Sequence, residues 1–293
     1  MKPPPFEYHA PGSTTEALEL LSQVGSDGKV LAGGQSLLPL LNLRLARPAH
    51  LIDINGLEPE IGQIRTNNGG LAIGAMTRQR TAERSQLIAE RCPLLAEALP
   101  LIGHVQIRNR GTIGGSLAHA DPAAELPAVA AVLDAELVVR GKRGERVLKA
   151  DDFFVTFLTT AVEPDELLVE VRLPGWPRGA GWSYQEVSRR HGDFAMVGVA
   201  CLVSLSQDGT ISEARLGYTG AAPSPVRARA AERSLRGQYP SSDSFAEAAE
   251  QAAAALDPAA DVHAPAAYRL HVAKVLTRRA LQTAVSRATG GGA

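Results

Sequence analysis

The chain has 293 residues, of which 45% are hydrophobic and 21% are charged. This length and composition predict two globular domains with ordinary hydrophobic cores. A formal net charge of −1 gives no basis for binding nucleic acid or an anionic membrane, and no signal-peptide-like or long apolar run is visible, which predicts a cytoplasmic protein with no membrane span.

The first half of the chain is expected to alternate short strands and helices. Strands are predicted at residues 29–32, 50–54, 60–65, 71–74, 136–140, 147–149 and 167–173. The segment from Asn67 to Gly70 is the strongest turn signal, because an Asn-Gly pair between two strands favours a tight hairpin. A helix is expected to start at Ser36, helical structure to run with breaks from Thr77 to Leu99 with a fresh start at Pro93, and a further helix to run from Asp121-Pro122 to Leu133.

A proline- and glycine-rich segment, Pro174 to Gly179, interrupts the hydrophobic periodicity. We expect the domain boundary there, which predicts a first domain of residues 1–177 and a second of residues 178–290. The second domain is expected to have strands at residues 181–188, 195–206 and 211–219, followed by helices at residues 227–235, 244–256 and 266–285. Ser206 to Gly209 is the expected hairpin turn between its last two strands.

Two glycine-rich segments are the main candidates for chemistry. Ala32-Gly33-Gly34-Gln35-Ser36 follows a predicted strand, and Gly111-Thr112-Ile113-Gly114-Gly115-Ser116 precedes a predicted helix. Glycine exposes backbone N–H groups, which can converge on a phosphate or pyrophosphate. Taken singly, each segment is more typical of a tight turn that binds no ligand. The P-loop and GxGxxG patterns are both missing, which argues against a P-loop or Rossmann-type nucleotide site.

Three sequence runs together carry a family resemblance. The runs at residues 32–44 (AGGQSLLPLLNLR), 108–127 (RNRGTIGGSLAHADPAAELP) and 186–200 (EVSRRHGDFAMVGVA) occur in the order expected for one protein family. The chain resembles the flavoprotein subunit of molybdenum hydroxylases, a group that includes the medium subunit of aerobic carbon monoxide dehydrogenase and the flavin domain of xanthine dehydrogenase. The resemblance covers nearly the whole chain and implies FAD as the cofactor.

The resemblance also implies which residues bind FAD. The two glycine motifs of the family enclose the FAD pyrophosphate. The corresponding residues are Leu31, Ala32, Gly33, Gly34, Gln35, Ser36, Leu37, Thr112, Ile113, Gly114, Gly115 and Ser116. Ile102, or its neighbour Leu101, corresponds to a position near the adenine.

Two polar residues near the second motif are further candidates. Glu125 stands where relatives have an acidic residue, often Asp, that contacts the cofactor, although a charge in the first turn of a helix explains it equally well. His119 lies beside the second glycine motif and could hydrogen-bond a cofactor hydroxyl.

Three candidates are implied near the flavin ring. Leu167 lies in the Pro164-Asp165-Glu166-Leu167-Leu168 block, from which a hydrophobic residue touches the flavin region in relatives. Phe194 matches an aromatic position near the ring, and core packing is the competing explanation for both residues. Gln185 stands where some relatives have lysine, which puts a charge interaction with the flavin in doubt.

No residue is assigned a catalytic or metal-binding role. The histidines His104, His119 and His191 are not spaced as metal ligands, and Cys92 and Cys201 are too far apart in the sequence to form an iron–sulfur ligand set. Both cysteines are expected to be buried free thiols. The flavin itself would carry the redox chemistry.

The resemblance implies an α+β fold, with a two-subdomain FAD-binding domain of the PCMH type followed by a C-terminal domain of three antiparallel strands plus helices. It also implies two partners, a small [2Fe-2S] subunit and a large molybdopterin subunit, assembled as a dimer of heterotrimers. Substrate would be oxidised on the molybdenum subunit, and electrons would pass through the clusters and FAD to an external acceptor. The alternatives are a stand-alone FAD-dependent oxidoreductase of related fold and a scaffold protein that has lost FAD.

Overall fold

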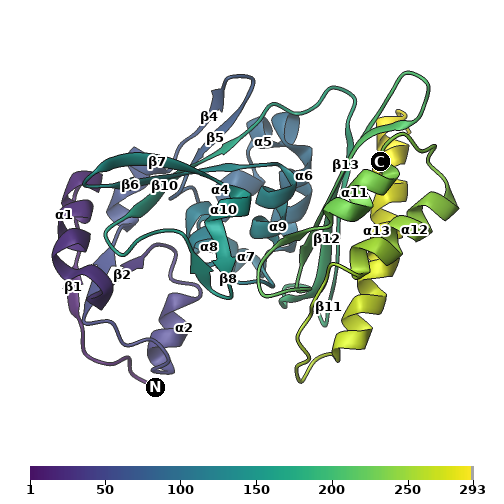
Figure 1. Cartoon of the computed structure of the whole chain (residues 1–293). Coiled ribbons are helices and arrows are strands. Elements are labelled where there is room, and N and C mark those ends of the chain that lie inside the picture. The colour runs from purple at the N-terminus through teal and green to yellow at the C-terminus, as the bar shows by residue number, and fades with distance from the viewer. Residues whose placement is uncertain (292–293) are drawn as a thin grey trace.

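The N-terminal part of the fold is a small parallel sheet. The computed structural model describes residues 1–291 and has an α+β architecture (Figure 1). Its first sheet has the strand order β1–β3–β2, formed by β1 (Glu7–His9), β2 (Gly28–Leu31) and β3 (His50–Asp53). Helix α1 (Thr14–Val24) connects the first two strands and buries Ala17, Leu18 and Leu21 in one core with Ile52. Such a crossover is what parallel strands require.

A five-stranded antiparallel sheet stands next to it, in the order β4–β5–β10–β6–β7. Its strands are β4 (Ile64–Asn67), β5 (Gly70–Gly74), β6 (Glu136–Gly141), β7 (Gly144–Lys149) and β10 (Leu167–Leu173). Asn68 and Gly69 have φ values of 46° and 83° and close the β4–β5 hairpin. The long-range pairing of β10 with β5 brings two parts of the sequence that are far apart into one sheet.

The chain between β5 and β6 forms six helices, which lie between the five-stranded sheet and the C-terminal sheet (Figure 1). They are α4 (Gln79–Glu83), α5 (Gln86–Arg91), α6 (Pro93–Ala98), α7 (Val105–Arg110), α8 (Ile113–His119) and α9 (Glu125–Val132). Their largest core includes Ile73 of β5 and Leu95 of α6, and it extends to Tyr184 and Leu202 of the C-terminal sheet.

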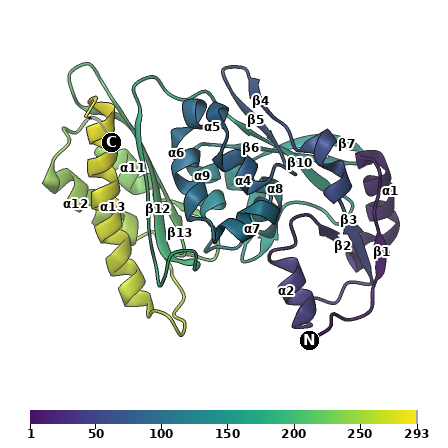
Figure 2. The same ribbon diagram turned by 180° about the vertical axis from the view of Figure 1, so that it is seen from behind.

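The C-terminal sheet has the order β11–β12–β13–β14 and is antiparallel throughout. Its elements are β11 (Gly181–Ser188), β12 (Ala195–Leu205), β13 (Ile211–Thr219) and β14 (Val226–Arg227), followed by α11 (Arg229–Leu235), α12 (Ser242–Ala253) and α13 (Ala266–Ala288). Alternate residues of β12 serve two cores: Ala200 packs toward α6 and α9, whereas Val199 packs with the C-terminal helices. Figure 2 shows α13 along that second face.

Short elements complete the structure. They are α2 (Leu37–Asn42), α3 (Glu58–Ile61), α10 (Ala150–Phe153), β8 (Phe154–Thr156), β9 (Thr159–Thr160) and 3-10 turns at Gly25–Asp27, Asn55–Leu57 and Leu99–Leu101. Among residues 1–291, no helix combines the length and the apolar character needed to cross a membrane.

Several expectations from the sequence are confirmed. The Asn67–Gly70 turn joins two paired strands, Pro93 begins a helix, and the strands at residues 181–188 and 211–219 have the predicted bounds. Cys92 and Cys201 are both free and buried. The α+β fold is confirmed as well, and the C-terminal sheet gains a fourth strand, the two-residue β14.

Three local predictions are wrong. Residues 60–65 are not one strand, because α3 continues to Ile61 before β4 begins. Thr77 does not cap a helix; its hydroxyl donates to the Gly62 carbonyl instead. The helix expected at Asp121-Pro122 begins at Glu125, because the Asp121 carboxylate accepts a hydrogen bond from the Ala123 N–H at 2.8 Å and closes a turn before the helix.

Candidate functional site

The loop between β2 and α2, residues 32–36, is the first glycine loop. Within residues 1–291, no acceptor takes a hydrogen bond from the backbone N–H groups of residues 33 to 37. The α2 backbone bonding begins with the next donor, from the Leu38 N–H to the Gly34 carbonyl at 3.0 Å. Because Gly33 is buried, a donor without a partner there costs free energy unless a ligand accepts from it. Five successive donors of this kind suit the oxygen atoms of a pyrophosphate.

The glycines of this loop also allow a close approach within the protein. A Cβ on Gly33 would lie 2.4 Å from the Arg110 carbonyl oxygen and 2.8 Å from the Gly111 Cα. Gly34 has a φ of +73°, a backbone conformation that residues with a side chain rarely adopt. The first glycine loop is therefore held directly against the segment that leads into the second glycine motif.

The second glycine motif, residues 111–116, differs from the predicted turn because Ile113 to Ser116 form the first turn of α8. Thr112 caps this helix by accepting from the Gly115 N–H at 3.0 Å. The Ile113 and Gly114 N–H groups donate to the carbonyl oxygens of Thr77 and Ala75, at 2.9 and 2.8 Å. The Ser116 N–H donates to the Thr112 carbonyl. These donors are thus already paired within the protein.

The glycines of the second motif have a packing role. A Cβ on Gly114 would lie 2.4 Å from the Ala75 Cβ, so α8 can approach β5 only with glycine at this position. A Cβ on Gly115 would lie 2.5 Å from the Thr112 hydroxyl oxygen and 3.5 Å from the Ala32 Cβ. The two motifs therefore lie in contact, although residues 37–110 separate them in the sequence.

Two side chains that the sequence analysis missed connect the motifs. Asn55 donates from Nδ2 to the Ala32 carbonyl at 2.9 Å. Arg78 donates from Nη2 to the Asn55 Oδ1 and from Nη1 to the Arg110 carbonyl, both at 2.7 Å. Burial lowers the pKa of Arg78. No local motif marks either residue, because their partners are distant in the sequence.

Two of the other candidates lie near the second motif. Ile102 is buried, and its carbonyl accepts from Nη1 of the buried Arg108 at 2.9 Å. His119, at the end of α8, is half-buried, and its pKa is lowered chiefly by burial, with a smaller contribution from the positive charge of Lys29. Lys29 belongs to β2, which leads into the first glycine loop.

Glu125 belongs to a buried acidic cluster at the start of α9. Only 5% of Glu125 is exposed, and burial, followed by the charge of Glu186, raises its pKa to about 8. Burial raises the pKa of Glu186 on β11 to about 7. The neighbouring Tyr184 hydroxyl is buried, and no group among residues 1–291 meets hydrogen-bond geometry with it. The sequence analysis identified Glu125 but missed Tyr184 and Glu186.

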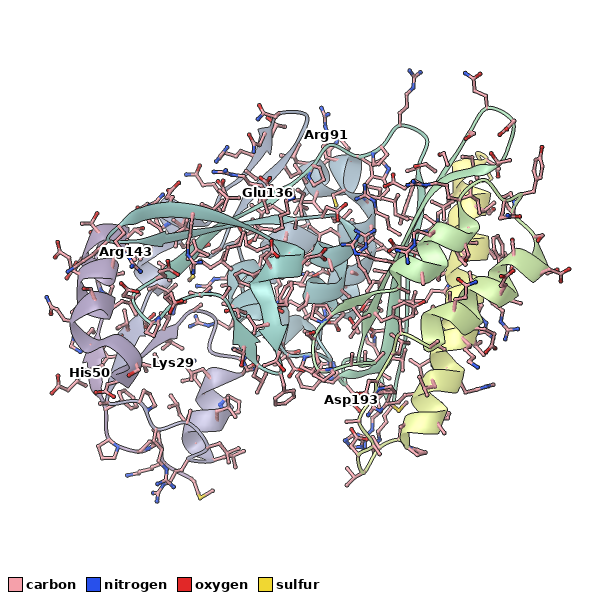
Figure 3. The ribbon with its side chains drawn as sticks, in the orientation of Figure 1. Lys29, His50, Arg91, Glu136, Arg143 and Asp193 are labelled. Carbon is pink, nitrogen blue, oxygen red and sulfur yellow. The ribbon has the colours of Figure 1, made fainter. Side chains whose placement is uncertain are left out.

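The remaining candidates lie in three different environments, and Leu167 shares a hydrophobic core with Ala32 of the first glycine loop. Leu167 is buried in the core that also contains Met76. Gln185 donates to the Thr283 hydroxyl of α13 at 3.4 Å, so it faces the C-terminal helix, while Tyr184 faces the other side of the sheet. Phe194 is 66% exposed in the loop between β11 and β12, where Figure 3 labels its neighbour Asp193. The structure therefore places His119 on the helix that begins with the second motif, whereas Gln185 points toward α13.

Two known protein families match the sequence of this chain. Residues 4–176 match the family described as FAD binding domain in molybdopterin dehydrogenase, and residues 182–284 match the CO dehydrogenase flavoprotein C-terminal domain. The chain belongs to the FAD-binding medium subunits of molybdenum hydroxylases. FAD is accordingly the cofactor of this family of subunits.

Similarity to individual members of this family extends over the full chain. The chain is 44% identical to 6-hydroxypseudooxynicotine dehydrogenase complex subunit alpha from Paenarthrobacter nicotinovorans, over 98% of this chain and 97% of the relative. It is 42% identical to the carbon monoxide dehydrogenase medium chain from Hydrogenophaga pseudoflava, over 98% and 99%. A solved carbon monoxide dehydrogenase from Hydrogenophaga pseudoflava, lacking the Mo-pyranopterin moiety, aligns with a TM-score of 0.95 and 44% identity, covering 98% of this chain and 99% of that one.

Proposed function

We propose that this chain is the FAD-binding subunit of a molybdenum hydroxylase complex. In this proposal, electrons from [2Fe-2S] clusters of a partner subunit reach an external acceptor by way of FAD held on this chain. The observation that carries the proposal is the first glycine loop, which lies against the segment leading into the second motif and which, among residues 1–291, has five successive backbone N–H groups without an acceptor. Membership of the FAD-binding family identifies the ligand that these donors suit.

Each part of the site has a proposed role in holding the cofactor. Bound FAD would supply the redox chemistry, and the chain would supply its position and shielding. The N–H groups of residues 33–37 would bind the pyrophosphate, and the second motif would close the other side of this loop. Ile102 would pack near the adenine, and Glu125 would donate a proton or a hydrogen bond in its neutral form, which its raised pKa favours. Leu167 and Phe194 remain candidates for the flavin end.

We further propose a small [2Fe-2S] subunit and a large molybdopterin subunit as partners, in a dimer of heterotrimers. Relatives of this chain are described as the medium chain or one subunit of a complex, which supports a multi-subunit assembly. Two exposed apolar groups offer surfaces for such partners. They are Leu38, Leu43 and Leu45 in and after α2, and Val155, Phe157 and Leu158 around the β8–β9 hairpin. Buried at an interface, these side chains would favour association.

Substrate choice is assigned to the molybdenum subunit rather than to this chain. Relatives with nearly equal identity, 44% and 42%, are named for different substrates, 6-hydroxypseudooxynicotine and carbon monoxide. This pattern supports a shared flavin module that serves different oxidation sites. The domain boundary is proposed between residues 177 and 178, which lie between the family matches to residues 4–176 and 182–284. A cytoplasmic location for the complex is proposed as well.

Reconstitution with FAD tests the function. The purified chain incubated with FAD should retain one flavin per chain after gel filtration, measured by flavin absorbance. Gly33→Val should abolish retention, because its side chain would collide with the Arg110 carbonyl. Gly12→Ala is the matched control, since the nearest atom to its new Cβ, a flexible Glu16 oxygen, is 3.7 Å away. No FAD retention by the unmodified chain would contradict the proposal.

Isolation from the native host separates the proposed complex from a stand-alone enzyme. The chain should co-purify with one iron–sulfur protein and one molybdenum protein, identified by mass spectrometry and metal analysis. A chain that purifies alone and oxidises a substrate without either partner would instead be a stand-alone FAD-dependent oxidoreductase.

A further inference from the structure

Three potential metal ligands meet at the edge of the N-terminal sheet. Glu7 and His9 lie on β1, and His50 is the first residue of β3. One ligand atom from each residue lies within 4.8 Å of the other two. Figure 3 labels His50 on this sheet, away from the C-terminal domain. None of these three residues was predicted from the sequence to bind a metal ion.

Strand register explains why these side chains meet. The parallel pairing of β1 with β3 places Glu7 directly beside His50. His9 is two residues after Glu7, so both side chains point to the same face of the strand. Ile52 shares that face with His50 and is fully buried under α1. The two imidazoles consequently lie at the margin of a core, where about a quarter of each side chain is exposed (26% and 25%).

The separations between the three ligand atoms suit a small divalent cation. His9 Nε2 is 3.2 Å from His50 Nδ1, His50 Nδ1 is 3.4 Å from a Glu7 carboxylate oxygen, and His9 Nε2 is 4.0 Å from the same oxygen. Tetrahedral zinc with bonds of about 2.0–2.1 Å requires ligand atoms about 3.3 Å apart. Two of the three separations match this value, and the exposed Glu7 side chain can move to shorten the third.

We propose that Glu7, His9 and His50 bind one divalent transition-metal ion, with Zn²⁺ as the best match. Two imidazole nitrogens and one carboxylate oxygen favour zinc or another late first-row ion over Mg²⁺ and Ca²⁺, which prefer oxygen ligands. The fourth position faces solvent on the Glu7 side and takes a water molecule. In the structure the His9 and His50 imidazoles hydrogen-bond each other directly, and the bound ion would take the place of this hydrogen bond.

The proposed ion would fasten the N-terminal strand to the sheet. β1 has only three residues and pairs with β3 along one side, so a shared ion adds a link that does not depend on the backbone ladder. β3 continues into Asp53 and then Asn55, the residue that holds the first glycine loop through the Ala32 carbonyl. In this proposal the ion has a structural role. By binding only the folded chain, it would stabilise the N-terminal sheet, which supports the first glycine loop.

Metal titration of the full chain, prepared without a histidine tag and stripped with a chelator, tests the site. The chain should bind one equivalent of Zn²⁺ by calorimetry, and Co²⁺ in its place should show the visible absorption of a tetrahedral nitrogen–oxygen site. His9→Ala and His50→Ala should each weaken Zn²⁺ binding by about tenfold or more, because each removes one of three protein ligands. Glu7→Gln should weaken it less while preserving the shape of the side chain.

His271→Ala is the matched control, because His271 is an exposed histidine outside the cluster. It should bind Zn²⁺ like the unmodified chain. Zn²⁺ should also raise the Tm of the unmodified chain and of His271→Ala, but not of His50→Ala. FAD retention by each variant shows that it is folded. Equal Zn²⁺ binding by His9→Ala, His50→Ala and the unmodified chain, or no binding by the folded unmodified chain, would overturn the proposal.

Discussion

The two glycine motifs look alike in sequence but differ in what their backbones do. In the first glycine loop, five successive N–H groups have no acceptor within residues 1–291. In the second motif, the donors of residues 113 to 116 are taken up by Thr77, Ala75 and Thr112. A Gly-Gly pair therefore stands in a loop whose backbone donors lack acceptors within residues 1–291 in one case, and at a close helix–strand contact in the other. The two roles can be told apart only by the hydrogen-bond acceptors that each motif finds in the folded chain.

The largest expected effect comes from the packing glycine. Gly114→Val would place its side chain against Ala75, so we expect the free energy of unfolding of the FAD-free chain to fall by about 1–3 kcal/mol. Urea unfolding followed by circular dichroism measures this change, with Gly12→Ala as the control. If the Gly114→Val chain is as stable as the control, the packing role of the second motif is wrong.

The second prediction concerns Asn55 and Arg78, which connect the two glycine motifs. Asn55→Ala removes the donor to the Ala32 carbonyl and leaves Arg78 without one of its acceptors. Leaving these partly buried groups without a hydrogen bond costs about 1–3 kcal/mol and releases the first glycine loop. The Kd for FAD should therefore rise by about tenfold. Asn109→Ala, at an exposed position of α7, is the matched control. Fluorescence titration with FAD measures the Kd of both variants. Equal Kd values would show that Asn55 does not support the FAD site.

The buried acidic cluster predicts an effect on stability that depends on pH. The pKa of Glu125 is about 8 in the folded chain and near 4.5 when unfolded, so between these values the folded chain holds the extra proton. The free energy of unfolding should therefore fall as the pH rises from about 5 to 8 and level off above. Glu125→Gln should flatten this slope and stabilise the FAD-free chain at pH 8 by about 1–3 kcal/mol. Unfolding curves between pH 5 and 9 test this, and an unchanged slope would contradict it.

Local sequence signals predicted the elements that are defined by local interactions. The Asn67–Gly70 hairpin, the helix at Pro93 and the strands of the C-terminal sheet follow from turn chemistry and hydrophobic pattern. Helix α7 was missed because its polar sequence gives little helical pattern. It is held instead by Arg108, which donates to the carbonyls of Ile102 and Gly103 and pairs with Glu83.

The candidate site was predictable only where the family resemblance covered it. The two glycine segments were predicted from their backbone chemistry, and the resemblance assigned them and Glu125 to FAD. Asn55 and Arg78 were missed because they act through partners 23 and 32 residues away. Gln185 shows the opposite case. It stands just before the third motif and was predicted near the flavin, but strand alternation turns its side chain toward α13. The direction of a side chain and its partners at distant positions are set by the folded chain, so local sequence patterns do not predict them.

Hydrogen exchange of the backbone amides, with and without FAD, tests the difference between the motifs most directly. In the FAD-free chain, the amides of residues 33–37 should exchange fast and those of residues 113–116 slowly, because only the latter are hydrogen-bonded within the protein. FAD should slow exchange in residues 33–37 strongly and change residues 113–116 little. Slow exchange of residues 33–37 without FAD, or FAD protection confined to residues 113–116, would contradict the account.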